Sequence, residues 1–113
     1  MRKTILFLIL AGVMVGLSLS SFPALAADEI KIGSIWPMTG PGALWGMPFH
    51  NVAQFQADQI NAKGGLTVGG KKYLIKIIKE DTKYVPSEAR KVTEKLIYQD
   101  KVKFILGPLG GGE

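Results

Sequence analysis

Residues 102–112 have the sequence VKFILGPLGGG, in which an apolar run interrupted only by Lys103 is followed directly by a turn-rich stretch. A largely apolar run is typical of a strand at the centre of a parallel sheet, because helices cover both faces of such a sheet. The glycines that follow predict a loop at the carboxyl end of this strand, where open parallel sheets bind their ligands. We therefore expect residues 102–106 to form a central strand and the glycines to lie close to a binding site.

The residues just before this run predict a helix, and before it a second strand. Pro86 fits the first position of a helix, where its missing N–H is not needed. Apolar residues then recur with the spacing i, i+4, i+7, i+11 on one side of that helix: Val85, Ala89, Val92 and Leu96. Residues 73–78 read as the second strand, and Gly69-Gly70 suits the tight turn of a small hairpin that leads into it.

The start of the mature chain predicts one more strand and one more helix. Residues 30–36 form a β-branched run that ends at Pro37, and residues 38–42 read as a loop. A helix is then expected with Pro48 in its first turn and Gly64-Gly65 as its stop, and its buried face would contain Phe49, Val52, Ala53 and Ile60. The resulting order β-α-β-α-β predicts an α/β fold with a doubly wound parallel sheet.

The first 26 residues have the three parts of a cleavable signal peptide. Two basic residues at positions 2 and 3 precede an apolar run from Ile5 to Leu17, and Ala24 and Ala26 suit a cut after residue 26. A membrane-spanning helix is the alternative, but spanning needs about 20 apolar residues, and serines and a proline interrupt the run between 18 and 23. We predict a signal peptide at 1–26 and a periplasmic mature protein.

Composition excludes several kinds of protein. The chain contains no cysteine, which excludes a disulfide framework and a lipid-carrying cysteine at the cleavage site. Its formal charge of +5 includes Arg2 and Lys3, which leave with the signal. The remaining lysines are spread out without interleaved aromatic residues, so no nucleic-acid partner is expected.

A set of short motifs resembles the periplasmic branched-chain amino-acid-binding proteins, the substrate-binding proteins of ABC transporters. In chain order the motifs are Ile30-Lys31-Ile32-Gly33, Pro37-Met38-Thr39-Gly40-Pro41, Trp45-Gly46, Ile60-Asn61-Ala62-Lys63-Gly64-Gly65, Glu80-Asp81, Pro86 with Ala89, and Gly107-Pro108. The resemblance implies a type I periplasmic binding fold with two lobes, of which residues 27–113 would be the N-terminal part of the first lobe. It also implies that the chain is an N-terminal fragment of a protein that is monomeric when full length.

The same resemblance implies a function. The protein would bind a small ligand between its lobes, such as a branched-chain or other amino acid or a related amide or carboxylic acid. It would then deliver this ligand to the membrane permease subunits of an ABC importer. The alternative is a sensor, in which the same lobes pass the ligand signal to a transmembrane partner.

The resemblance also implies where the ligand is held. Trp45 matches an aromatic residue that packs against the ligand's side chain, and Gly110, Gly111 and Gly112 follow the third strand, where backbone N–H groups hold a carboxylate. Glycines allow that close approach, but they equally suit a plain turn. Trp45 could instead fill the core, and the Thr39 hydroxyl could serve the ligand or a turn.

No enzyme, cofactor or metal site is predicted. His50 has no partner for catalysis or metal binding, so we expect it on the surface or in packing. Glu80 and Asp81 are adjacent on a strand end and point to opposite faces, so they do not form an acid and base pair; one of them should cap the following turn. A dinucleotide-binding oxidoreductase is the competing enzyme class, since Gly40, Gly42 and Gly46 follow the first strand, but the helix starts too late for that fingerprint and the acid comes about 40 residues on rather than ~20.

Overall fold

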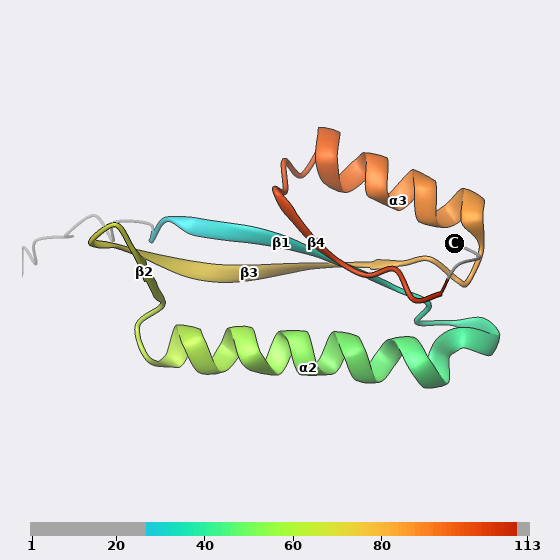
Figure 1. The fold of residues 1–113 in the computed structure, drawn as a ribbon, viewed down its shortest axis with the longest axis horizontal. Coiled ribbons are helices and arrows are strands. Elements are labelled where there is room, and N and C mark those ends of the chain that lie inside the picture. Colours follow the sequence, from blue (N-terminus) through green and yellow to red (C-terminus); the bar gives the residue numbers. More distant parts are fainter. Residues whose placement is uncertain (1–26, 111–113) are drawn as a thin grey trace, which may run out of the picture.

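The computed structural model describes residues 27–110, which form a four-stranded sheet with one long helix on each face (Figure 1). The predicted signal peptide at 1–26 and the predicted ligand residues Gly111 and Gly112 lie outside this range. In chain order the elements are β1 (Glu29–Trp36), the short 3-10 helix η1 (Gly40–Gly42), α2 (Ala43–Ala62), β2 (Leu66–Val68), β3 (Lys71–Asp81), α3 (Pro86–Tyr98) and β4 (Phe104–Leu106). The predicted β-α-β-α-β order, with a small hairpin before the second strand, is confirmed.

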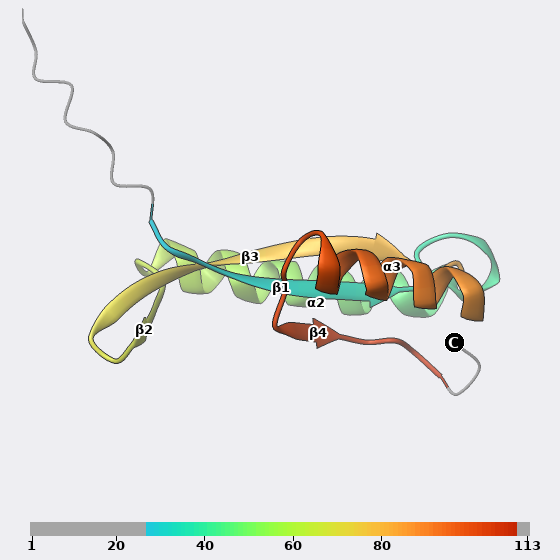
Figure 2. The ribbon, with the colours of Figure 1, turned by 90° about the horizontal axis from the view of Figure 1, so that it is seen from above.

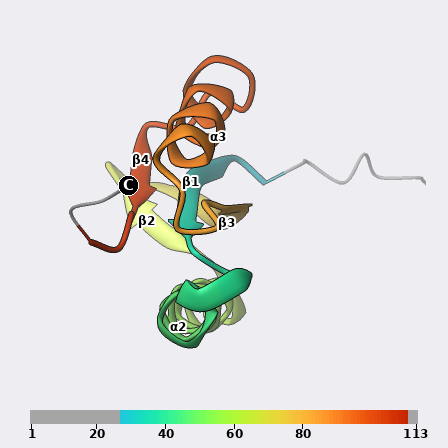
Figure 3. The same ribbon diagram turned by 90° about the vertical axis from the view of Figure 1, so that its right-hand side faces the viewer.

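The sheet has the strand order β2-β3-β1-β4, with β1 parallel to both of its neighbours (Figure 2). Only β2 runs antiparallel, as the first arm of the hairpin with β3. The chain passes from β1 to β3 in one direction and then from β3 across β1 to β4 in the other. Because both crossovers are right-handed, the reversal places α2 and α3 on opposite faces (Figure 3). The sheet is therefore doubly wound, as the sequence predicts.

The apolar core lies between the sheet and α3. It contains Ile35, Val92, Leu96 and Val102, with Ile78 and Ile105 packed against it. Leu96 is fully buried, and Ala89 and Val92 of the same helix are also buried, which confirms the predicted stripe except for Val85, which is 40% exposed. Val102 contributes to this core although β4, the strand predicted over residues 102–106, begins only at Phe104. Strand β3, predicted over residues 73–78, is longer than predicted and extends to Asp81.

Helix α2 packs on the opposite face of the sheet, and its closest approach is at a glycine. Its buried residues are Gly46, His50 and Ala57. A Cβ atom at position 46 would lie 2.0 Å from the carbonyl oxygen of Pro37, so only glycine fits there. The 20-residue helix thus meets the backbone of the loop after β1 directly near its start.

Two predictions about this helix were wrong. It begins at Ala43 rather than at Pro48, so the proline lies inside it. The predicted buried face was also wrong in part, since Phe49 is 47% exposed and Val52 61% exposed, whereas Ala53 and Ile60 are half-buried. The periodicity of apolar residues therefore identified the buried side of α2 only in part.

The three parallel strands end at the same side of the sheet, and this arrangement positions the candidate site. The loop after β1 spans 37–42, the loop after β3 spans 82–85, and the segment after β4 spans 107–110. All three lie at the right-hand end of the view in Figure 1. No helix within residues 27–110 has the length and apolar character needed to cross a membrane.

Candidate ligand-binding site

A pocket of about 370 Å³ lies where these three loops meet. The loop after β1 and the start of α2 contribute one wall, the loop after β3 a second, and the segment after β4 a third. The lining residues are Pro41, Gly42, Trp45, Tyr84, Leu109 and Gly110. None of them carries a charge, and their polar side-chain groups are the Tyr84 hydroxyl and the indole N–H of Trp45. The pocket therefore suits the apolar part of a small molecule.

The structure brings two of the predicted site residues together in this pocket. Trp45 is 67% exposed, so it is not a core residue in the described part of the chain. Gly110 faces it from the segment after β4 and has a φ angle of +95°, which glycine adopts without strain. Both residues line the same hollow although they are far apart in the sequence, as expected if both contact one ligand.

Thr39 lies beside this pocket and does not line it. Its hydroxyl donates a hydrogen bond to one carboxylate oxygen of Asp81. The other oxygen accepts from the backbone N–H of Met38 at 2.8 Å and from that of Lys83 at 2.8 Å. Asp81 therefore joins the loop after β1 to the loop after β3, and it is the acid that caps the turn into α3.

The pKa of Asp81 reflects this set of donors. Burial alone would raise the pKa of its carboxyl group, but the hydrogen bonds from the Thr39 hydroxyl and from three backbone N–H groups outweigh burial. The net effect holds the pKa below its ordinary value of 3.8. Asp81 is thus a carboxylate at neutral pH whose oxygens are engaged in fixing the loops.

Tyr84 is the pocket residue that the sequence did not reveal. It comes from the loop after β3, whereas the candidates considered in the sequence were Glu80 and Asp81 at the end of the strand itself. The rule that identified Trp45, an aromatic residue in a loop at the carboxyl end of a parallel strand, applies equally to Tyr84. Its exposed fraction of 50% and its place in the pocket lining make it a second aromatic wall opposite the glycine-containing segment.

A separate polar cluster is buried beneath α2. The Ser34 hydroxyl accepts a hydrogen bond from the indole N–H of Trp36 at 2.9 Å and lies 3.1 Å from Nδ1 of His50. The hydroxyl can hydrogen-bond Nδ1 in either tautomer of the imidazole, because it has one proton to donate and two lone pairs to accept with. Burial, and next the positive charge of Lys79, lower the pKa of His50. Ser34 is fully buried, so this cluster serves packing, as predicted for His50.

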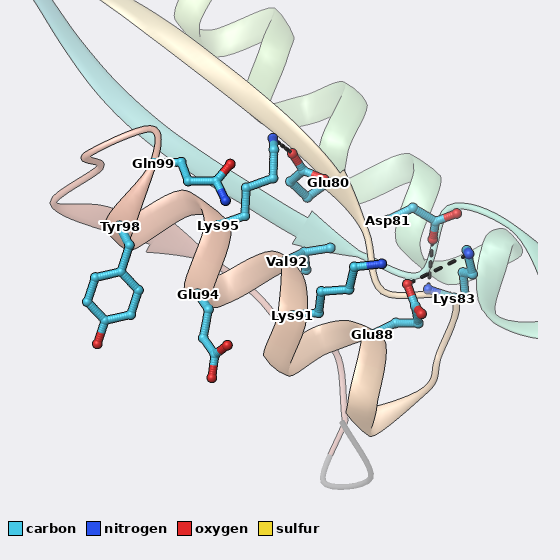
Figure 4. A pocket seen from close by; sticks show the side chains of 10 residues that line it. All are labelled: Glu80, Asp81, Lys83, Glu88, Lys91, Val92, Glu94, Lys95, Tyr98 and Gln99. Carbon is cyan, nitrogen blue, oxygen red and sulfur yellow. Dashed lines mark hydrogen bonds and ion pairs between the residues drawn. The ribbon is translucent and has the colours of Figure 1, made fainter.

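A larger hollow of about 600 Å³ lies between β3 and α3, and its character is different (Figure 4). Charged side chains of both signs dominate it, and several of them form ion pairs. Lys95 bonds Glu80 and lies 3.3 Å from Asp100, and Lys83 lies 3.7 Å from Glu88. Internally paired charges on an exposed groove leave little to recognise a ligand, so we assign no site here.

No group of three or more histidine or acidic side chains within residues 27–110 is arranged to hold a metal ion.

Comparisons with known proteins agree with this geometry. The family described as periplasmic binding protein matches residues 29–113. The Leu/Ile/Val-binding protein BraC3 of Rhizobium johnstonii is 35% identical over 92 residues, which is 81% of this chain and 24% of that protein. The chain therefore spans about a quarter of the length of this relative.

Two solved structures share the fold. One is the branched-chain amino acid transporter substrate-binding protein LivJ of Streptococcus pneumoniae in complex with isoleucine, with a TM-score of 0.67, 36% identity and coverage of 75% of this chain and 23% of that one. The other is an ABC transporter solute-binding protein of R. palustris in complex with benzoate, with a TM-score of 0.59, 26% identity and coverage of 75% and 22%. These relatives are solute-binding proteins rather than enzymes. The family match and the shared fold show that this chain belongs to the periplasmic binding protein family.

Proposed function

We propose that the protein is the solute-binding component of an ABC importer. It binds a small organic ligand between two lobes, and residues 27–113 supply the N-terminal part of the first lobe. The observation that carries this proposal is the uncharged pocket at the carboxyl ends of β1, β3 and β4, in which Trp45 and Gly110 meet. Ligands of open α/β sheets bind at this edge, where the strand order reverses.

The ligand class follows from the pocket and from what the relatives bind. Isoleucine and benzoate, the ligands of two structural relatives, each combine a carboxylate with an apolar group. In our proposal Trp45 packs against the apolar group, and the backbone N–H groups of Gly110 and of the glycines after it hold the carboxylate. Thr39 contributes to the site indirectly: its hydrogen bond to Asp81 fixes the loop after β1, in which Thr39 lies.

We further propose that residues 1–26 direct export and are removed after Ala26, which places the mature protein in the periplasm. The second lobe would close over the bound ligand, and the closed form would dock on the permease. Closure of two lobes excludes water and shifts the population from open to closed.

Ligand titration of the full-length protein tests this proposal. The protein is purified, freed of bound ligand by unfolding and refolding, and titrated calorimetrically with the branched-chain amino acids, other amino acids, their amides and small carboxylic acids. We expect at least one of these to bind with micromolar affinity or better, about −8 kcal/mol. Trp45→Ala should weaken that binding by about tenfold or more, since an aromatic contact contributes roughly 0.5–1.5 kcal/mol beyond the area it buries.

Leu44→Ala is the matched control. Leu44 precedes Trp45 on α2 and is 85% exposed, but it does not line the pocket. Its removal should leave the affinity unchanged. Equal losses of affinity in both variants would contradict the proposed site. Failure of every compound in the set to bind would contradict the proposed function.

A further inference from the structure

We infer that Tyr84 is a specificity-determining residue of the ligand site, and that the site prefers a carboxylate with a planar aromatic group over one with a saturated group of similar size. This inference rests on the proposed function, which it deepens by naming the ligand class. It concerns the end of the ligand that lies in the uncharged pocket. The sequence motifs do not contain Tyr84, and its role comes from the structure alone.

The Tyr84 side chain connects the two segments that were predicted to contact the ligand. Its Cβ lies 3.3 Å from the place that a Cβ atom on Gly42 would occupy. Its hydroxyl lies 3.2 Å, and its Cε2 3.5 Å, from the corresponding place on Gly110. The side chain therefore reaches from the loop after β1 to the segment after β4. Because both neighbours are glycines, no side chain from either position covers the ring.

The backbone holds Tyr84 in this place in a conformation that tyrosine rarely adopts. Its φ angle is +61°, in the left-handed region, which is unusual for a bulky residue. Hydrogen bonds fix the turn around it, from the N–H of Lys83 to Asp81 at 2.8 Å and from the N–H of Val85 to the carbonyl of Thr82 at 2.9 Å. Strained conformations of this kind persist where the surroundings enforce them, and they concentrate at ligand sites.

Both aromatic residues of the pocket present exposed ring surface, and this surface decides the ligand class. Trp45 and Tyr84 are 67% and 50% exposed, so both rings have surface left for a ligand. Burying an apolar group of either kind gains from the area removed from water. A planar ring also gains from stacked or edge-to-face packing on each aromatic wall, an advantage of up to about tenfold in affinity per ring pair. A saturated ring lacks this second contribution.

Two carboxylates of matched size and charge test the inference in the full-length protein. Benzoate and cyclohexanecarboxylate differ in the planarity and unsaturation of the ring, so the ratio of their dissociation constants isolates the aromatic contribution. We expect the unmodified protein to bind benzoate at least fivefold more tightly than cyclohexanecarboxylate. Tyr84→Phe should keep the preference, because the ring remains. Tyr84→Gly should reduce the ratio to less than twofold and weaken benzoate binding about tenfold.

Lys83→Gly is the matched control. Lys83 has a φ angle of +54° beside Tyr84, but it does not line the pocket. Glycine relieves backbone strain at either position, so both variants should unfold at the same or a higher temperature than the unmodified protein without ligand. Only Tyr84→Gly should lose the preference for benzoate. This combination, a retained melting temperature with a lost preference, is not expected of a residue that serves packing alone.

The outcomes separate the inference from the function on which it rests. Benzoate binding that is unchanged in Tyr84→Gly, or loss of the preference in Lys83→Gly as well, would overturn the role of Tyr84. A protein that binds an aliphatic amino acid but does not prefer benzoate would overturn the aromatic class and leave the proposed function standing. Failure to bind any member of the wider ligand set would overturn the proposed function itself.

Discussion

Single residues at this site have roles that their types alone do not determine. Trp36 is the last residue of β1, and Trp45 lies in the first turn of α2. Trp45 is largely exposed, whereas Trp36 stacks on Phe49 with ring centroids 5.0 Å apart. Thr39 and Asp81 were singled out for ligand and turn roles, and they bond to each other. The sequence predicted that these residues gather at one edge, but the exposure of each depends on contacts made across the sheet.

The buried His50 predicts how stability depends on pH. Its folded-state pKa is lowered from 6.5, so between that value and the lowered pKa the unfolded chain binds more protons than the folded chain. The free energy of unfolding should therefore keep its full contribution from neutral His50 above about pH 6.5 and fall as the pH drops below that value. Thermal unfolding of the protein between pH 8 and pH 5 measures this dependence. Asp81 does not contribute in that range, because its unfolded-state pKa is near 3.8.

His50→Phe is the matching variant, because it keeps a ring under α2 and removes the titrating group. We expect a flatter dependence of the melting temperature on pH below 6.5 in this variant than in the unmodified protein. Parallel curves for the two proteins would show that protonation of His50 does not govern stability.

At the scale of the elements, the sequence predicted which helices and strands exist better than it predicted where they begin. Helix α3 starts at Pro86 and buries three of the four residues of the expected stripe, because its apolar and polar residues lie on separate sides. Helix α2 starts before its proline, and the close approach at Gly46 leaves no room for a larger residue there. Periodicity identifies an apolar face, but it does not tell which face a neighbouring backbone can approach.

The two prolines should respond oppositely to substitution. Pro48 lies inside α2, where proline lacks the N–H that the carbonyl of Leu44 would accept from. Pro48→Ala should therefore raise the free energy of unfolding by roughly 1–2 kcal/mol. Pro86→Ala, at the first position of α3, restores no hydrogen bond and should lower it by about 0.5 kcal/mol through the freer unfolded chain. Urea unfolding measures both changes, and a loss of stability in Pro48→Ala would mean that the proline shapes the start of α2.

At the scale of the whole molecule, the sheet is open at one side. Strand β4 pairs with β1 alone within the described residues, and its Phe104 and Leu106 are 60% and 41% exposed. This chain corresponds to 24% of the length of its Rhizobium relative, and in our proposal further strands and a second lobe complete the fold and the site. The sequence predicted the fold of this part because the alternation of strands and helices is local, whereas the ligand contacts depend on parts that meet only in the complete fold.

The most direct test of the central claim is a crystal structure of the full-length protein with the ligand that titration identifies. We predict that the ligand lies at the carboxyl ends of β1, β3 and β4, with its apolar group against Trp45 and Tyr84 and its carboxylate toward the segment that begins at Gly110. A ligand bound elsewhere, for example in the charged groove beside α3, would contradict this prediction.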